Sequence, residues 1–343
     1  MMEPVKKYVN IPFLLGVLAL SILLALSLGA YRMPLDQMWS SLFDASRGNT
    51  HFLMLNIRLP RIILAGAVGA GLAISGTAVQ GLFRNPLADQ SLIGVSSGAM
   101  LFAVLSIVFM GTALSDLTQF LKQASVAIFA FGGGLITTFL VYQLSKKNGK
   151  TNVMTMLLAG IAITAFAGAI TGIFIYLSND QQLRDITFWS LGSFSGANWV
   201  QVLIVLPIVG GGSLVLFTFA KALNGILLGE GEAQYLGIRV ERVKTIIIFL
   251  TALIVGVCIS ISGLIGFVGL IIPHFLRLIK GSDYRYLLRS APLLGAIFLI
   301  IADTLARTII APAELPIGIL TAMVGAPFFL WLLLRSKKHH FSI

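Results

Sequence analysis

The sequence predicts an all-α membrane protein with about ten spanning helices per subunit. Hydrophobic residues make up 57% of the 343 positions and charged residues only 11%, whereas a soluble domain usually carries about 25% charged residues. Charge-free apolar runs of about 20 residues, the length that crosses a bilayer, recur along the whole chain. Because the charges fall in the short breaks between these runs, we interpret residues 1–343 as a single transmembrane domain.

Each apolar run predicts one span, except where its length calls for two elements. The first run follows Lys6 and Lys7 as in a signal peptide, but its length exceeds the roughly 7–15 residues of a signal core, so we interpret it as a retained helix. A long run ending at 220 is divided into an interfacial helix and turn at 189–198 and a span. Another is divided at Ser262-Gly263. The predicted spans are approximately 11–30, 62–83, 92–115, 123–145, 151–179, 199–220, 244–262, 264–280, 291–311 and 316–335.

The distribution of basic residues predicts the orientation. The chain has 24 Lys and Arg against 13 Asp and Glu, a net charge of +11. With the N-terminus inside, seven basic residues lie outside and the other 17 lie in the cytoplasm, as the positive-inside rule requires. An even number of spans also brings the basic C-terminus inside. The outer seven are Arg32, Arg47, Arg58, Arg61, Lys122, Arg184 and Arg307.

Glycine, with 35 residues, gathers within the predicted spans, most densely in the second and fourth and as a GxxxG pair, Gly168 and Gly172, in the fifth. Small residues let helix backbones approach closely in lipid, which predicts a tightly packed bundle. The single cysteine, Cys258, lies in an apolar run, so it predicts neither an intramolecular disulfide nor a cysteine-bound metal.

Polar segments between the spans are the candidate functional sites. The inner loop with Asn85, Pro86 and Leu87 is either a capped turn or a constriction at the cytoplasmic mouth of a path, since Pro86 cannot continue a helix. The outer arginines Arg58 and Arg61 are either interfacial anchors or a docking point for acidic side chains, because a guanidinium can clamp a carboxylate with two hydrogen bonds.

Asp303 and Arg307 lie four residues apart in the ninth span, so the two side chains can pair on one helix face. A charge pair within a span marks a functional site, either for partner docking or for proton coupling. The cytoplasmic segment around 228–239 contains Glu230 and Glu232 and predicts two short helices separated near Gly237. It is either a protein contact or a solvated loop.

Several segments, in order along the chain, resemble the FecCD-type permeases of bacterial ABC importers, which include vitamin B12, ferric-siderophore and haem permeases. One departure is Gly263-Leu264, where the family commonly has Gly-Pro. The matching segments are RLPR (58–61), QGLFRNPLAD (80–89), LIGVSSG (92–98), LAGI (158–161), FWSLG (188–192), GEGEA (229–233) with Leu236-Gly237, GFVGLIIPH (266–274), DTLAR (303–307) and PAELPIG (312–318).

The resemblance implies a type II ABC importer permease fold, as a homodimer in the bacterial inner membrane with both termini in the cytoplasm. Its partners would be two ATPase subunits, which use ATP and Mg²⁺, and a periplasmic or lipid-anchored substrate-binding protein; this subunit would bind no cofactor and no nucleic acid and would not be an enzyme. The residues that match the family's sites are as follows: Arg58, Arg61 and Arg307 for binding-protein docking; Glu230, Glu232, Ala233, Leu236 and Gly237 for ATPase coupling; Asn85, Pro86, Leu87, Asn152 and Val153 for the cytoplasmic gate.

The transported ligand is expected to be an iron–siderophore complex, with haem and vitamin B12 as alternatives. Two other classes of protein stay open. An ion-coupled secondary transporter predicts a buried acidic residue near the membrane midplane, and only Asp303 comes near that description. A membrane-embedded enzyme predicts a polar catalytic set within the spans, which the sequence does not contain.

Overall fold

The computed structural model describes residues 10–29, 34, 41, 48–113, 119–147 and 149–340. This part of the chain is almost wholly helical, with one short antiparallel hairpin formed by β1 (Lys146–Lys147) and β2 (Lys150–Thr151). The helices are α2 (Ile11–Ser27), α4 (Gly48–Phe52), η2 (Leu53–Arg58), α5 (Leu59–Leu82), η3 (Gln90–Ile93), α6 (Val95–Ala113), α7 (Gln119–Ser145), α8 (Val153–Tyr176), α9 (Asp180–Leu191), α10 (Trp199–Thr218), α11 (Ala220–Leu228), α12 (Glu230–Tyr235), α13 (Val240–Ser262), α14 (Val268–Lys280), α15 (Tyr284–Ala306) and α16 (Ile317–His340).

The all-α prediction is confirmed, and a helix occupies each of the ten predicted ranges. Within the described residues, six helical segments have the length and hydropathy to cross a membrane, and α2, α6 and α16 contribute shorter apolar stretches. The number of membrane crossings stays a prediction. Lys6, Lys7, Arg32 and Arg47, on which the orientation partly depends, lie outside the described residues, as do the ends of the first and third predicted spans.

The second span begins earlier than predicted. Helices α4, η2 and α5 form one continuous segment, Asn49–Leu82, of 34 residues. Arg58 and Arg61 therefore lie within a helix and not in an outer loop, so the loop prediction is wrong. Pro60 lacks the N–H that would continue the π-helical hydrogen bonds of η2, and Trp199 Nε1 donates to the carbonyl oxygen of Leu55 at 2.9 Å in its place. The π-helical turn η2 continues the helix upstream.

The predicted break at Ser262-Gly263 is confirmed, but the helix that follows is shorter than predicted. Gly263 ends α13 with φ at +69°, and residues 263–267 are irregular. Helix α14 then has 13 residues, about 20 Å at 1.5 Å per residue, which is less than the roughly 30 Å hydrocarbon core. Phe267 also has a φ of +69°. Its side chain lies against Gly325 of α16, where an added Cβ would be 2.3 Å from the ring.

The predicted interfacial helix at 189–198 lies elsewhere. Helix α9 covers Asp180–Leu191 and residues 192–198 are irregular. Its start is set by a capping box in which the Asn179 side chain accepts from the Gln182 N–H and the Gln182 side chain accepts from the Asn179 N–H. These reciprocal bonds satisfy donors that every helix start leaves open.

Helix α5 is the centre of the bundle, with 83% of the apolar stretch that would cross the membrane buried. It packs against α10, α13, α14 and α15. Its glycines permit this: a Cβ added at Gly69 would lie 2.2 Å from the carbonyl oxygen of Gly295 in α15, and one at Gly76 would lie 2.1 Å from that of Gly269 in α14. The predicted close packing is confirmed here.

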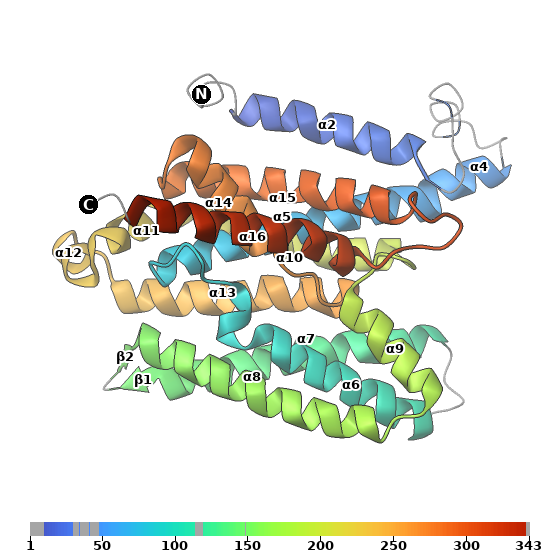
Figure 1. Ribbon diagram of the computed structural model, residues 1–343, viewed down its shortest axis with the longest axis horizontal. Coiled ribbons are helices and arrows are strands. Elements are labelled where there is room, and N and C mark those ends of the chain that lie inside the picture. The colour runs from blue at the N-terminus through green and yellow to red at the C-terminus, as the bar shows by residue number, and fades with distance from the viewer. Residues whose placement is uncertain are drawn as a thin grey trace.

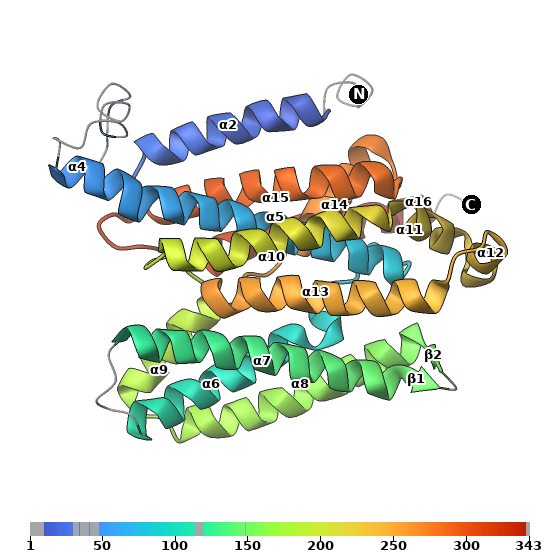
Figure 2. The ribbon, with the colours of Figure 1, turned by 180° about the vertical axis from the view of Figure 1, so that it is seen from behind.

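The two ends of the bundle carry different elements (Figures 1 and 2). One end holds α4, the start of α5 and the end of α15. At the other end lie α12 and the β hairpin, together with the start of α2 and the end of α16. The pair Gly168 and Gly172 faces open space instead of a neighbouring helix of this chain. Most of α8 is exposed as well, with only 17% of its apolar stretch buried.

Candidate functional site

Five charged residues gather at the α4 end of the bundle. We call them the arginine–carboxylate cluster: Arg58, Arg61, Asp303, Arg307 and Glu314. The three arginines are 4%, 8% and 7% exposed, and Asp303 is 1% exposed. Because a buried charge is costly unless it is paired and hydrogen-bonded, each member requires partners from the others or from the backbone.

Arg61 joins the two carboxylates of the cluster. Its Nη2 atom lies 2.8 Å from Asp303 Oδ1, and its Nε donates to both oxygens of Asp303 at 3.0 Å. The same guanidinium donates to Glu314 Oε1 and Oε2 at 2.8 and 3.0 Å. The sequence-predicted pair is also present but longer, with Arg307 Nε at 3.7 Å from Asp303 Oδ2. Sequence reasoning missed Arg61 as the main partner of Asp303.

The other two arginines hold the end of α2. Arg58 donates to the carbonyl oxygen of Leu26, and Arg307 donates to that of Ala25. The last carbonyls of a helix have no partner within it, so cations are favourable there. Both guanidinium groups lie within 3.2 Å of the position of a Cβ added at Gly29. The cluster therefore fixes α2 against α5 and α15.

The structure brings Arg58, Arg61 and Arg307 together but does not expose them. Their role in docking an external protein stays a prediction. In this structure a partner's carboxylate would reach Arg61 only after displacing Glu314, whose side chain is 37% exposed. The cluster as found is a structural centre in which charges of both signs are largely paired.

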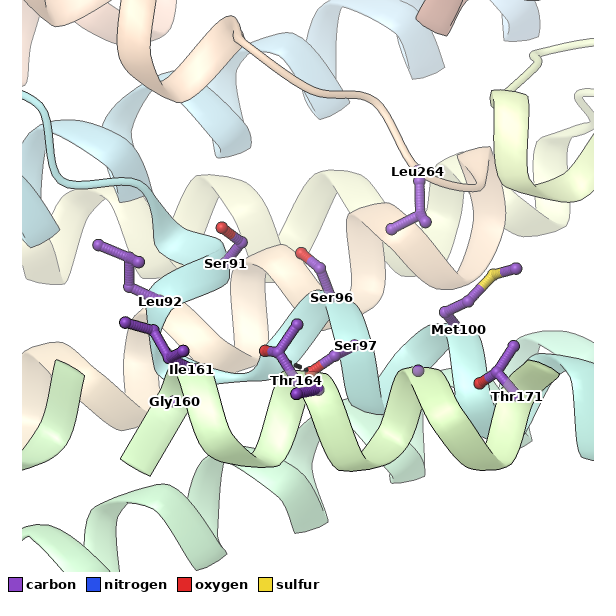
Figure 3. A pocket seen from close by; sticks show the side chains of 12 residues that line it. Ser91, Leu92, Ser96, Ser97, Met100, Gly160, Ile161, Thr164, Thr171 and Leu264 are labelled. Atoms are coloured by element: carbon purple, nitrogen blue, oxygen red, sulfur yellow. Dashed lines mark hydrogen bonds between the residues drawn. The ribbon is translucent and has the colours of Figure 1, made fainter. Parts of the chain in front are cut away.

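A groove of about 570 Å³ lies between α6 and α8, along the middle of α8 (Figure 3). Its surface is mainly apolar, and among its few hydroxyl groups Thr164 Oγ1 donates to Ser97 Oγ at 3.2 Å. Leu264, from the irregular segment before α14, closes one side. Side chains with small dipoles and one thioether offer weak, dispersed contacts to a ligand. The lining residues that Figure 3 labels are Ser91, Leu92, Ser96, Ser97, Met100, Gly160, Ile161, Thr164, Thr171 and Leu264.

A second hollow, which we call the hairpin cleft, lies at the α12 end and has a volume of about 860 Å³. It brings together candidate gate residues from two loops, Asn85 on one side and Asn152 and Val153 on the other, with the coupling candidate Glu230. The full lining is Phe83, Arg84, Asn85, Lys147, Lys150, Thr151, Asn152, Val153, Met154, Leu157, Glu230, Gln234 and Glu241. Pro86 and Leu87 lie on the exposed loop beside it.

Lys244 joins the two acidic residues of the hairpin cleft. It is 1% exposed, and its Nζ donates to Glu230 Oε2 at 2.7 Å, to Glu241 Oε1 at 3.1 Å and to the Thr151 carbonyl at 3.0 Å. Glu241 also accepts from the Thr151 N–H at 2.7 Å. From the sequence, Lys244 was only one of the 17 basic residues assigned to the cytoplasmic side. These bonds connect α12, α13 and the β hairpin.

The coupling candidates differ in their surroundings: Glu230 is bound to Lys244, Ala233 packs inward, and Glu232, Leu236 and Gly237 are exposed. Ala233, on the inner face of α12, is fully buried, whereas Leu236 is 66% exposed and Glu232 is exposed. The predicted break at Gly237 is present, with a φ of +79° in the left-handed region. The second short helix is not: after the break the 23-residue helix α13 begins at Val240, so 228–239 holds the one short helix α12. Helix α12 thus presents an exposed acidic and apolar face to whatever lies beyond this end of the bundle.

Asp283, which precedes α15, connects that helix to α11, the helix before α12. Asn224 Nδ2 in α11 donates to Asp283 Oδ1 at 2.7 Å, and the Tyr284 N–H donates to Asn224 Oδ1 at 2.9 Å. The bond from Asn224, with that from the Arg285 N–H, lowers the pKa of Asp283 from its ordinary value. The charged form is thus favoured, and α11 is tied to the start of α15.

Comparison with known proteins gives consistent results over nearly the whole chain. The model of the FecCD transport family matches residues 17–335. The hemin transport system permease protein HmuU of Yersinia pestis is 42% identical over 326 residues, covering 95% of both chains. The cobalamin import system permease protein BtuC of Halobacterium salinarum is 43% identical over 277 residues, 81% of this chain and 72% of that protein. A solved inward-facing structure of a putative metal-chelate type ABC transporter is 34% identical, has a TM-score of 0.80 and covers 94% of this chain and 97% of its own.

Proposed function

The chain belongs to the FecCD transport family, and from that premise we propose that it carries a bulky metal chelate across the bacterial inner membrane. It is a multi-pass ABC importer permease and not itself an enzyme, since in this family ATP is hydrolysed by separate subunits. We further propose that the chain assembles with a second copy of itself, with two ATPase subunits at the α12 end and with a substrate-binding protein at the α4 end.

The observation that carries the proposal is the position of the groove between α6 and α8. It lies along the middle of an exposed helix, with the arginine–carboxylate cluster at one end of the bundle and the hairpin cleft at the other. A mainly apolar surface with a few hydroxyl groups offers contacts that accept a ligand without holding it tightly, as passage requires. Two such grooves facing each other across a dimer would form the path.

We propose an iron–siderophore complex as the ligand, which is consistent with the solved metal-chelate type relative. Haem and vitamin B12 are the alternatives, and the names of the relatives support these two directly. The test reconstitutes the permease with its ATPase and binding protein in liposomes and measures uptake of a labelled ferric siderophore, hemin and cobalamin. ATP-dependent accumulation of one of them is the expected result. Accumulation driven by a proton gradient without the ATPase would overturn the importer mechanism in favour of an ion-coupled carrier.

We predict that Glu232→Arg weakens the functional affinity of the ATPase by about tenfold or more, because reversing an exposed charge at an interface places like charges together. The Glu232 side chain is exposed, and the bonds that hold α12 to Lys244 come from Glu230, so the fold should persist. The measurement is ATPase activity in liposomes as a function of ATPase concentration.

The matched control is Asp185→Arg, which reverses an equally exposed acid on α9, away from α12. It should leave the functional affinity of the ATPase unchanged. A titration curve for Glu232→Arg that coincides with that of the control would reject α12 as the coupling element.

A further inference from the structure

The outer edge of the β hairpin is bound by side chains of α13. Across the hairpin, the Asn152 N–H donates to the Ser145 carbonyl at 3.0 Å. In an antiparallel pair, successive residues direct their backbone groups alternately toward and away from the partner strand, so both groups of Thr151 point away from β1. Its N–H donates to Glu241 and its carbonyl accepts from Lys244. The edge of β2 is therefore held by the start of α13.

Lys244 uses its ammonium group on three elements at once. A lysine ammonium has three N–H donors and no acceptor. Here the acceptors are the Thr151 carbonyl on the hairpin at 3.0 Å, Glu241 on α13 itself at 3.1 Å and Glu230 on α12 at 2.7 Å. The Lys244 side chain is 2% exposed, and a buried ammonium without such partners would be costly. These bonds therefore favour one arrangement of α12, α13 and the hairpin.

The path from α12 to the gate candidates through this ammonium is short. It starts at Glu230 in the first turn of α12 and passes through Lys244 to the carbonyl of Thr151. The candidate gate residues Asn152 and Val153 follow directly, and Asn152 is the N-cap of α8. Figure 1 shows α12, the start of α13 and the hairpin together at this end of the bundle. A shift of Thr151 would thus move the first turn of the helix that lines the groove.

The two ends of the Glu230–Lys244 bond differ in their access to water. The Glu230 side chain is 34% exposed, whereas the Lys244 side chain is enclosed. Bonds between an ammonium and a carboxylate are stronger than bonds between neutral groups. When α12 shifts, Glu230 can reach water, but the ammonium would lose an acceptor without gaining another. The lower cost is for the ammonium to follow Glu230, and Thr151 is bound to the same ammonium.

We propose that Lys244 is a positioning residue that couples α12 to the cytoplasmic gate through its bonds to Glu230 and to the Thr151 carbonyl. When the ATPase moves α12, the ammonium transmits the shift to the hairpin and so to Asn152 and Val153. The inference rests on the proposed function, because it takes α12 as the coupling element and the hairpin cleft as the gate. It adds the side chain that joins the two.

The test measures gate movement at Met154, which lines the cleft and is 66% exposed. Met154→Cys, in a Cys258→Ala background, is labelled with a water-soluble maleimide in nanodiscs that hold the permease and its ATPase, with and without ATP. We expect ATP to change the labelling rate at least about five-fold, the lower end of a typical coupling between two sites, and less than about two-fold in Lys244→Met. The matched control, Lys221→Met, removes an exposed lysine outside the cleft and should respond as the reporter chain does.

A second variant separates the link from charge balance. Two carboxylates and one ammonium give Glu230, Glu241 and Lys244 a net charge of −1. The double variant Lys244→Met with Glu230→Gln keeps that net charge but has no bond from α12 to the hairpin through residue 244. We expect it to stay unresponsive to ATP. A restored response would mean that Lys244 only balances charge, and the proposal would be overturned.

Two other outcomes would overturn the proposal. A full ATP response in Lys244→Met would mean that α12 reaches the gate by another route. A loss of ATPase affinity in this variant as large as that predicted for Glu232→Arg would mean that Lys244 positions α12 for docking and not for transmission. A failure of the proposed function is distinguishable from both, because ATP and the ATPase would then leave the labelling rate of the reporter chain with Lys244 unchanged, and the gate assignment would fall together with this inference.

Discussion

Replacing Asp303 by alanine is expected to lower the free energy of unfolding by about 3–5 kcal/mol, the cost of leaving buried charges without their partner. Asp303 is 1% exposed and accepts from Arg61, and Arg307 lies close to it. Without it, two guanidinium groups face each other with only Glu314 to balance them. Equilibrium unfolding in mixed micelles titrated with sodium dodecyl sulfate measures the change.

The control is the double variant Arg61→Met with Asp303→Leu, which removes both charges and keeps the volume apolar. It should recover part of the lost stability, because replacing a buried pair by apolar residues is often neutral, while Arg307 loses a carboxylate neighbour and keeps its bond to the Ala25 carbonyl. If the double variant is as unstable as Asp303→Ala, the contacts of the side chains and not their charges hold the cluster.

The burial of Arg61 also affects how docking is tested. Reversal of the charge of Arg61 would disturb the fold, so loss of uptake alone would not assign this residue to docking.

Gly69→Val is expected to lower the free energy of unfolding by at least about 3 kcal/mol, at the upper end of what overpacking costs. A Cβ at this position would lie 2.2 Å from the Gly295 carbonyl oxygen and 2.8 Å from its carbon, and both are backbone atoms that cannot rotate away. The helices α5 and α15 must then separate along their crossing. Thermal unfolding in detergent and the yield of folded protein measure the effect.

The matched control for Gly69 is Gly66→Ala, one turn earlier in α5. A Cβ there meets the end of the Ile300 side chain at 3.3 Å, which can shift by a few tenths of an ångström. We expect less than about 1 kcal/mol of change for this variant. A Gly69→Val protein as stable as the control would mean that α5 and α15 do not approach each other as closely as the structure has them.

The sequence predicted the local features of this fold and missed the distant ones. Apolar runs and Gly263 were sufficient to place ten helices and the break after α13, because both depend on neighbouring residues. The pair Asp303 and Arg307 was readable from its spacing of four. Arg61 and Asp303 are 242 positions apart, and no periodicity connects them. Lys244 was likewise seen as a loop charge, since only the fold brings Glu230 and Thr151 to it.

The errors in the predicted boundaries also have physical causes. The charge-free run that begins after Arg61 suggested a helix start at 62, but Arg58 and Arg61 are paired within the bundle, so the helical segment extends upstream through both of them to Asn49. The Gly- and Ser-rich stretch after Trp189 suggested a short helix there, but the capping box at Asn179 started α9 nine residues before the predicted position. In the second case the signal was present in the sequence and was given too little weight.

The enclosure of α5 has a consequence for biosynthesis. The helices that contact Gly76 and Gly69, α14 and α15, are made about 200 residues later, so in a nascent α5 the surface at these two glycines is covered by lipid until those helices insert. Contacts so distant in sequence make assembly slow and leave early intermediates open to wrong pairing. A chain truncated before Gly295 would therefore lack the part of α15 that packs against Gly69 of α5. In that incomplete form it is expected to be a substrate of membrane quality-control proteases.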